Sequence, residues 1–357
     1  MIRLERRAYV PIGLKVAAPV IAVLVALLLL AISLEIAGFS PFTLCRSALA
    51  VAFGSLAGVA EIIGRATPLT LTGLATVLAL RAGFINLGAE GQMIAAAFAA
   101  LLVSAGVLPF PTLAVVPFVI VTGFAAGATL AAFVAALKLR LRADEAIITV
   151  LLNVVMVFAL QLLTGATLQS FPPLGSTQPL PLASGAAFPN WGHALHVYCE
   201  PCVAFVACIV ASGLVHYTIW GLDIRATGGN PTAARFAGIR VGIVTLSVAS
   251  LSGGLAGLAG AGEVVSAGPG STPALVLGLG YAGIAVAYLA ALEPLGVIPA
   301  ALFVSIILCG ISAANQSIGV PLALGGDVIA LLLMTALIAH GAVRYRLRLK
   351  RPSEATS

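Results

Sequence analysis

The chain has 357 residues, of which 61% are hydrophobic and only 8% are charged, and its formal net charge is +6. Soluble domains average about 25% charged residues, so the composition excludes a soluble globular protein and indicates a membrane protein. The positive charge does not indicate nucleic-acid binding, because the basic residues form short clusters between long apolar runs.

The apolar run over residues 16–38 follows a basic start. It is longer than the core of a secretory signal, about 7–15 residues, so we expect a transmembrane helix that stays attached. Crossing the hydrocarbon layer takes about 20 apolar residues. The later runs predict further helices, for about ten in all, over residues 66–81, 84–105, 113–137, 146–165, 197–220, 241–262, 274–292, 295–313 and 323–341.

The basic residues predict the orientation of these helices, because cytoplasmic loops of membrane proteins are enriched in Lys and Arg. If the chain starts in the cytoplasm, every basic residue except Arg46 and Arg65 falls on the cytoplasmic side. We therefore expect an all-α transmembrane bundle, a single domain over residues 1–357 with both termini cytoplasmic. A proline-rich loop over residues 166–196 is then external, and the loop over residues 222–240 is cytoplasmic.

The first polar segment, residues 73–93, reads GLATVLALRAGFINLGAEGQM. Polar side chains within apolar helices usually face the bundle interior or a cavity, and glycines allow breaks in helix regularity. We therefore expect Asn86, Glu90 and Gln92 to line a solute path. The alternative is that Arg81 and Glu90 only mark a turn between two helices.

The second segment, ADEAIITVLLNVV over residues 143–155, begins with two carboxylates. Carboxylates are favoured in the first turn of a helix, and we expect this role for Asp144. Asn153 lies about two turns further on. It could line the path or make an interhelical hydrogen bond, and both readings stay open.

The third segment is the loop DIRATGGNPTAARFAGIRV, residues 223–241. A turn over residues 228–231 is expected to precede a short helix over residues 232–237, with Asn230 as its cap and Pro231 in its first turn. Ala233 and Ala234 would let this helix seat in a partner's groove, Arg235 would offer a charged contact, and Gly238 would close the helix. The alternative is an ordinary basic loop.

The remaining motifs say less about the function of the chain. Gly253, Gly257 and Ala261 have the spacing for close helix packing. The five cysteines form no disulfide framework, although Cys199 and Cys202 could pair in an oxidising compartment. Together with His193 and His196 they could form a metal site, but separate positions at an external interface are favoured. No phosphate-binding loop is present, so we expect no ATP hydrolysis by this chain. We also expect no bound cofactor and no metal.

In this order, the segments resemble the permease subunits of bacterial ATP-binding-cassette importers for nucleosides and simple sugars. The resemblance covers roughly residues 40–340 and looks more like the nucleoside branch than the ribose branch. It is carried by FINLGAEGQ at 84–92, DEAIITVLLN at 144–153, IRATGGNPTAARFAGI at 224–239 and GLGYAGIAVAYLAALEPLGVIPAALFVSIILCG at 278–310.

The resemblance implies a multi-pass subunit of the bacterial inner membrane. It would be surrounded by lipid and would not act as an enzyme. Its partners would be two cytoplasmic ATPase subunits, which bind the ATP, a second and different permease, and a periplasmic or lipid-anchored solute-binding protein. The loop over residues 224–239 would then be the helix that couples to the ATPase, through Asn230, Pro231, Ala233, Ala234, Arg235 and Gly238.

Two other classes of transporter are alternatives to an importer for nucleosides or simple sugars. A branched-chain amino acid permease of the same superfamily would share these segments. A secondary transporter driven by an ion gradient would need carboxylates deep in the membrane. Its candidate residues are Glu90, Glu263, Glu293 and Asp327, and the first three fall at predicted helix ends. No grouping of residues supports a membrane enzyme.

Overall fold

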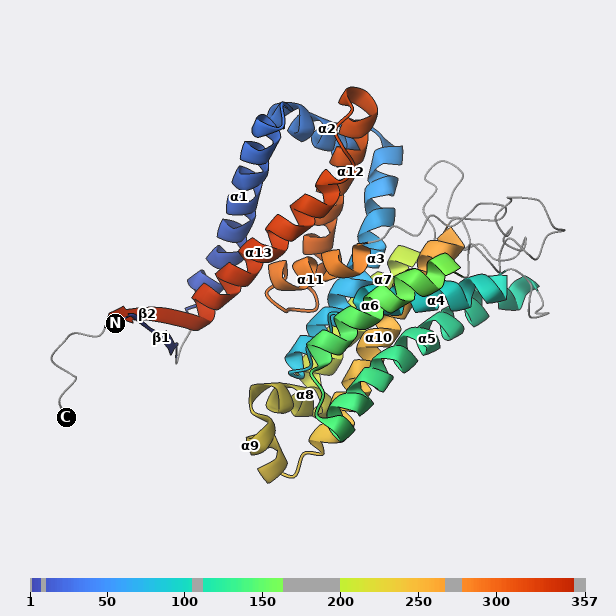
Figure 1. The fold of residues 1–357 in the computed structure, drawn as a ribbon, viewed down its shortest axis with the longest axis vertical. Coiled ribbons are helices and arrows are strands. Elements are labelled where there is room, and N and C mark those ends of the chain that lie inside the picture. The colour runs from blue at the N-terminus through green and yellow to red at the C-terminus, as the bar shows by residue number, and fades with distance from the viewer. Residues whose placement is uncertain (1, 8–10, 105–111, 163–199, 267–277, 350–357) are drawn as a thin grey trace.

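A computed structural model describes residues 2–7, 11–104, 112–162, 200–266 and 278–349. These residues form 13 α-helices and two β-strands (Figure 1). Seven of the helices are long and apolar enough to cross a membrane, so the protein is a multi-pass helical membrane protein. The helices are α1 (Ile12–Ile36), α2 (Pro41–Gly54), α3 (Leu56–Arg81), α4 (Ala89–Ser104), α5 (Thr112–Leu141), α6 (Glu145–Leu162), α7 (Glu200–Tyr217), α8 (Ile219–Gly229), α9 (Pro231–Phe236), α10 (Val241–Ser266), α11 (Leu279–Leu289), α12 (Val297–Ile318) and α13 (Leu324–Arg344).

The core is built around α3, which packs against α2, α7, α10, α11 and α12. Residues 66–79 of α3 are buried without a gap, so this part of the helix is enclosed on every face. Its side chains at Leu69, Leu74 and Leu78 are fully buried. The helix pair α1 and α13 lies side by side at the edge of this core (Figure 1).

Helices α5 and α10 pack closely against each other through glycines. A side-chain carbon added at Gly127 of α5 would lie 2.9 Å from the Cα atom of Gly257 in α10. Such a distance leaves no room for a side chain on either helix. The packing predicted for Gly253, Gly257 and Ala261 is therefore confirmed, with Gly123 and Gly127 on the facing helix.

The predicted helices differ from the observed ones in number and in several boundaries. Each predicted span has a counterpart, but α2, the first ten residues of α3 and the separate helix α8 were not expected. Charges at Arg46, Glu61 and Arg65 interrupt the apolar pattern there. Nevertheless α3 starts at Leu56, because the Ser55 hydroxyl caps it by accepting from the Gly58 N–H at 3.0 Å. Arg65, expected in a loop, lies inside α3 and donates to the Ser312 hydroxyl at 3.0 Å.

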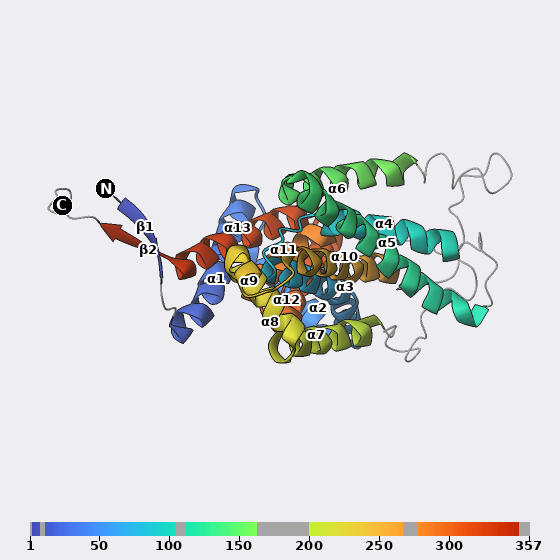
Figure 2. The same cartoon turned by 90° about the horizontal axis from the view of Figure 1, so that it is seen from below.

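The predicted all-helical architecture is observed, and the two ends of the chain add a short pair of strands to it. Strand β1 (Ile2–Arg6) pairs antiparallel with β2 (Tyr345–Leu349), with Ile2 opposite Leu349 and Arg6 opposite Tyr345. Figure 2 shows the two strands extending together beyond α1 and α13. This pairing brings the start of the chain to the end of α13.

Candidate functional site

The connection between α3 and α4 is not helical, although a helix was predicted from residue 84. After Arg81 the chain turns at Gly83, whose φ is +73°, and has no regular secondary structure over residues 84–88 before α4 begins at Ala89. We call residues 84–88 the extended segment. Phe84 is fully buried and anchors the segment in the core. An extended segment inside a bundle leaves backbone groups without helical partners, so neighbouring side chains have to supply them.

Helix α6 supplies some of these partners from one face. Glu145, Thr149 and Asn153 follow each other at intervals of four residues, so their side chains lie above one another along the helix. A Glu145 carboxylate oxygen accepts from the Ile85 N–H at 3.4 Å, and the Thr149 hydroxyl accepts from the Leu87 N–H at 3.3 Å. Glu145 also pairs with Lys138 at the end of α5.

Asn153 continues this row and uses its whole amide group. Its oxygen accepts from the Gly91 N–H at 2.8 Å. Its nitrogen donates to the Leu87 carbonyl at 2.8 Å and to the Tyr281 hydroxyl at 2.9 Å. Asn153 thus joins α6, the extended segment and α11, and the reading of Asn153 as an interhelical hydrogen-bonding residue is confirmed.

Asn86 and Gln92 form a reciprocal amide pair, with both hydrogen bonds at 3.0 Å. Asn86 also donates to the Ser252 hydroxyl at 2.9 Å and accepts from the Gly88 N–H at 3.0 Å. Ser252 in turn donates to the Ala75 carbonyl of α3 at 2.7 Å. All four hydrogen-bonding positions of the Asn86 amide are therefore satisfied inside the protein.

Glu90 bridges α4 to the start of α11. One carboxylate oxygen accepts from the Gly278 N–H and the other from the Gly280 N–H, each at 2.7 Å. These N–H groups belong to the N-cap residue and the first turn of α11, where the backbone has no helical partners and the helix dipole favours an anion. Glu90 is 2% exposed, so it acts as a buried cap supplied by another helix.

The four residues predicted to line a path therefore lie close together, around the extended segment. Asn86, Glu90, Gln92 and Asn153 are only 1–2% exposed, and they hydrogen-bond to protein groups. The exposed side chains beside them are Ile85 at 44% and Tyr281 at 36%. Sequence reasoning missed Tyr281. A hydroxyl among the glycines of an otherwise apolar stretch, GLGYAGIAV, was the available signal.

Two predicted caps are confirmed. Asp144 accepts from the Ala146 N–H at 2.9 Å at the start of α6. Asn230 accepts from the Thr232 N–H at 3.0 Å, and Pro231 occupies the first turn of α9. Gly238 ends that helix with a φ of +86°, a left-handed conformation that favours glycine.

Two details of the predicted loop are wrong. Gly228 and Gly229 do not form a turn, because α8 continues through both and breaks only at Asn230. Ala234 does not face outward, because it is 3% exposed and packs against the rest of the chain. The outward surface of α9 instead carries the exposed residues Ala233 and Arg235 together with Phe236, whose side chain is 90% exposed.

Helix α8 touches the end of α3 at a glycine. A side-chain carbon at Gly228 would lie 2.8 Å from the carbonyl carbon of Arg81 and 3.0 Å from the nitrogen of Gly83. Gly83 in turn begins the extended segment. The α8–α9 unit is therefore in direct backbone contact with the chain that leads to Asn86 and Glu90.

Arg81 also holds the turn between α11 and α12. Its guanidinium pairs with a Glu293 oxygen at 2.6 Å and donates to the Leu292 carbonyl at 2.7 Å. His216 of α7 lies 3.4 Å from the other Glu293 oxygen. Ala291 and Leu292 both have positive φ, which costs roughly 1–2 kcal/mol per residue without a compensating contact. Arg81 supplies that contact.

Among the described residues, no group of three or more His, Cys, Asp and Glu side chains could hold a metal ion. His193, His196 and Cys199 of the considered metal site lie outside the described residues, as does the loop over residues 166–196. Cys202 is free in the described part of the chain. Of the acidic residues considered for ion coupling, Glu90 caps α11 and Glu293 pairs with Arg81.

Comparison with known proteins gives a consistent result. Residues 58–338 match the family described as branched-chain amino acid transport system / permease component. The chain is 29% identical to a glucose ABC transporter permease protein of Haloferax volcanii, over 97% of this chain and 93% of that protein. It is 28% identical to a nucleoside ABC transporter permease protein of Lactococcus lactis over 86% of each chain. It is 27% identical to a guanosine ABC transporter permease protein of Bacillus subtilis, over 92% of this chain and 94% of that protein.

Proposed function

Because the chain belongs to the branched-chain amino acid transport system / permease component family, we propose that it is the membrane subunit of an ATP-driven importer for a nucleoside or a simple sugar. The named relatives carry glucose, nucleosides and guanosine, and they align with nearly the whole chain. The subunit transports without catalysing a reaction, and ATP is bound by a separate partner.

The observation that carries this proposal is the backbone contact between Gly228 and residues 81–83. An importer needs a partner-facing element that can move the solute path when ATP is hydrolysed. Here the exposed helix α9 follows directly on α8, and α8 touches the origin of the extended segment. A displacement of α8 would therefore be transmitted to the segment that Asn86 and Glu90 hold.

In this proposal the path runs beside the extended segment. Extended breaks between transmembrane helices are where transporters commonly bind their solutes, because free backbone groups and polar side chains meet there. In this proposal the position of this segment is fixed from its buried side by Asn86, Glu90, Gln92 and Asn153. Tyr281 and Ile85, which are exposed, form the surface that the solute passes.

The proposed assembly contains cytoplasmic ATPase subunits, a second and different permease, and a periplasmic or lipid-anchored solute-binding protein. Its location would be a bacterial inner membrane. The ATPase would dock on α9, where Pro231, Ala233 and Arg235 are exposed beside Phe236. Asn230 and Gly238 fix the two ends of that helix, and Ala234 seats it on the membrane domain.

Uptake measurements test the solute class. Deleting the coding region from its host should abolish uptake of labelled nucleoside or glucose, and the intact gene should restore it. Unlabelled nucleoside and glucose should be compared as competitors with leucine, the solute class in the family description. Competition by leucine alone would replace the proposed solute with a branched-chain amino acid.

Replacing the exposed Phe236 by aspartate should release the ATPase. Aromatic side chains are frequent binding hot spots, and truncating one typically costs 2 kcal/mol or more, about thirtyfold in affinity. Co-purification of the ATPase with the tagged permease measures this loss. Phe53 on α2 is similarly exposed at 83%, so Phe53→Asp is the matched control. ATPase retention in Phe236→Asp equal to the control would remove α9 as the docking element.

The proposed orientation places α9 and both termini in the cytoplasm. A reporter fused after residue 230 should then be active in the cytoplasm, and one fused after residue 180 should be active outside. The reverse pattern would place α9 on the external face, where an ATPase cannot reach it.

A further inference from the structure

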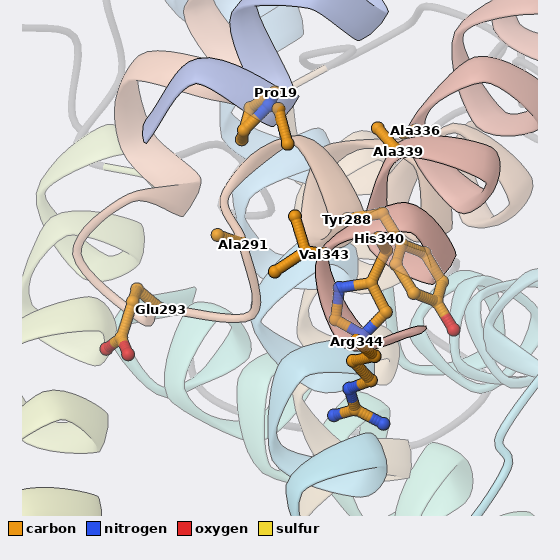
Figure 3. A pocket seen from close by; sticks show the side chains of 10 residues that line it. Pro19, Tyr288, Ala291, Glu293, Ala336, Ala339, His340, Val343 and Arg344 are labelled. Carbon is orange, nitrogen blue, oxygen red and sulfur yellow. The ribbon is translucent and has the colours of Figure 1, made fainter. Parts of the chain in front are cut away.

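A pocket of about 400 Å³ lies between α1, α13 and the turn that follows α11 (Figure 3). Its residues are separate from the polar network around Asn86. One wall consists of small apolar side chains, chiefly Ala18 and Pro19 of α1 with Ala336 and Ala339 of α13. Small residues on both helices leave a slot between them that their own side chains do not fill.

The rim of this pocket is polar and basic. Arg344, the last residue of α13, lines it with His340 and Tyr288, whose rings meet edge to face with centroids 5.3 Å apart. Figure 3 shows these three side chains grouped on one side of the pocket and Glu293 on the other. Arg344 is exposed and makes no ion pair with any residue that the structure describes.

The rim of the pocket carries more positive than negative charge. The Glu293 carboxylate is already paired with Arg81 at 2.6 Å, so little of its charge is left to oppose Arg344. Arg7 is joined to Arg344 by a backbone hydrogen bond of 2.9 Å, and its buried side-chain Nε has no hydrogen-bond partner.

An apolar slot under a basic rim, at the ends of two membrane-spanning helices, fits one class of ligand. An arginine binds a phosphate through charge-assisted hydrogen bonds, and an acyl chain fills an apolar slot between helices. A free inorganic anion would use the rim but leave the apolar wall empty. We propose that this pocket binds an anionic phospholipid of the membrane, with its phosphate at Arg344 and an acyl chain between α1 and α13.

The proposal rests on the proposed orientation in one respect, since that orientation assigns the lipid to the cytoplasmic leaflet. It predicts binding of the lipid itself, which is measured on purified protein without transport. Failure of uptake with lipid binding intact would therefore refute the importer and leave the pocket unaffected.

Native mass spectrometry of the purified, detergent-solubilised protein, with the partners that co-purify, tests this site. Dioleoylphosphatidylglycerol should bind at least about tenfold more tightly than dioleoylphosphatidylcholine, and millimolar inorganic phosphate should not displace it. Arg344→Gln should weaken phosphatidylglycerol binding about tenfold, the expected scale for losing one charged hydrogen bond. Ala339→Phe, which fills the slot without changing charge, should weaken both lipids.

Arg140→Gln is the matched control, because Arg140 is an exposed arginine in the last turn of α5, away from the pocket. It should leave the affinity for phosphatidylglycerol unchanged. Equal affinity for the two lipids, equal losses in Arg344→Gln and Arg140→Gln, displacement by phosphate, or unchanged lipid binding in Ala339→Phe would each overturn the proposal.

Discussion

We expect Gly228→Ala to reduce uptake at least about tenfold and to lower the stability of the protein. The added carbon would lie within 3.0 Å of the backbone of residues 81–83, which cannot move aside as a flexible side chain could. Overpacking of this kind costs roughly 1–3 kcal/mol, and a displaced α8 would no longer follow the extended segment. Uptake and the midpoint of thermal unfolding measure the two consequences.

The neighbouring glycine provides a control with the same chemical change. A side-chain carbon at Gly229 would meet no atom within 4 Å, although both glycines lie in α8. Gly229→Ala should therefore keep full uptake. Equal behaviour of the two variants would show that the contact between α8 and the end of α3 does not transmit motion.

Replacing Glu90 by alanine should destabilise the protein by about 2–6 kcal/mol, because one buried and one partly buried N–H group lose their acceptor at about 1–3 kcal/mol each. Those donors are the N-cap residue Gly278 and the first-turn residue Gly280 of α11, so the start of that helix should fray. Glu90→Gln should lie between the alanine variant and the wild type, because it keeps one acceptor oxygen. Denaturant unfolding of the purified protein measures the loss.

Glu35→Ala is the control for Glu90, because Glu35 is an exposed acid near the end of α1. It should change the free energy of unfolding by no more than about 0.5 kcal/mol. A stability of Glu90→Ala equal to this control would show that the carboxylate does not hold α11. Retained stability combined with lost uptake would instead favour direct contact of Glu90 with the solute.

Sequence alone determined the features that depend on a few neighbouring residues. Composition identified a membrane protein, since no soluble core could bury so much apolar surface with 8% charged residues. Asp144 and Asn230 were correctly predicted as caps, because a cap bonds only two or three residues along the chain. The spacing of Gly253 and Gly257 correctly predicted a close helix contact, although it did not say which helix would fill it.

Tertiary structure decided the features that depend on distant segments. No local pattern shows that Glu90 caps a helix that begins at Leu279, or that Asn153 reaches Tyr281. The same holds for α9, where Ala234 faces inward and Phe236 faces outward because α8 and α10 pack on one side of it. Burial and hydrogen-bond partners follow from the contacts of the whole bundle, and a one-dimensional pattern does not specify which helices meet.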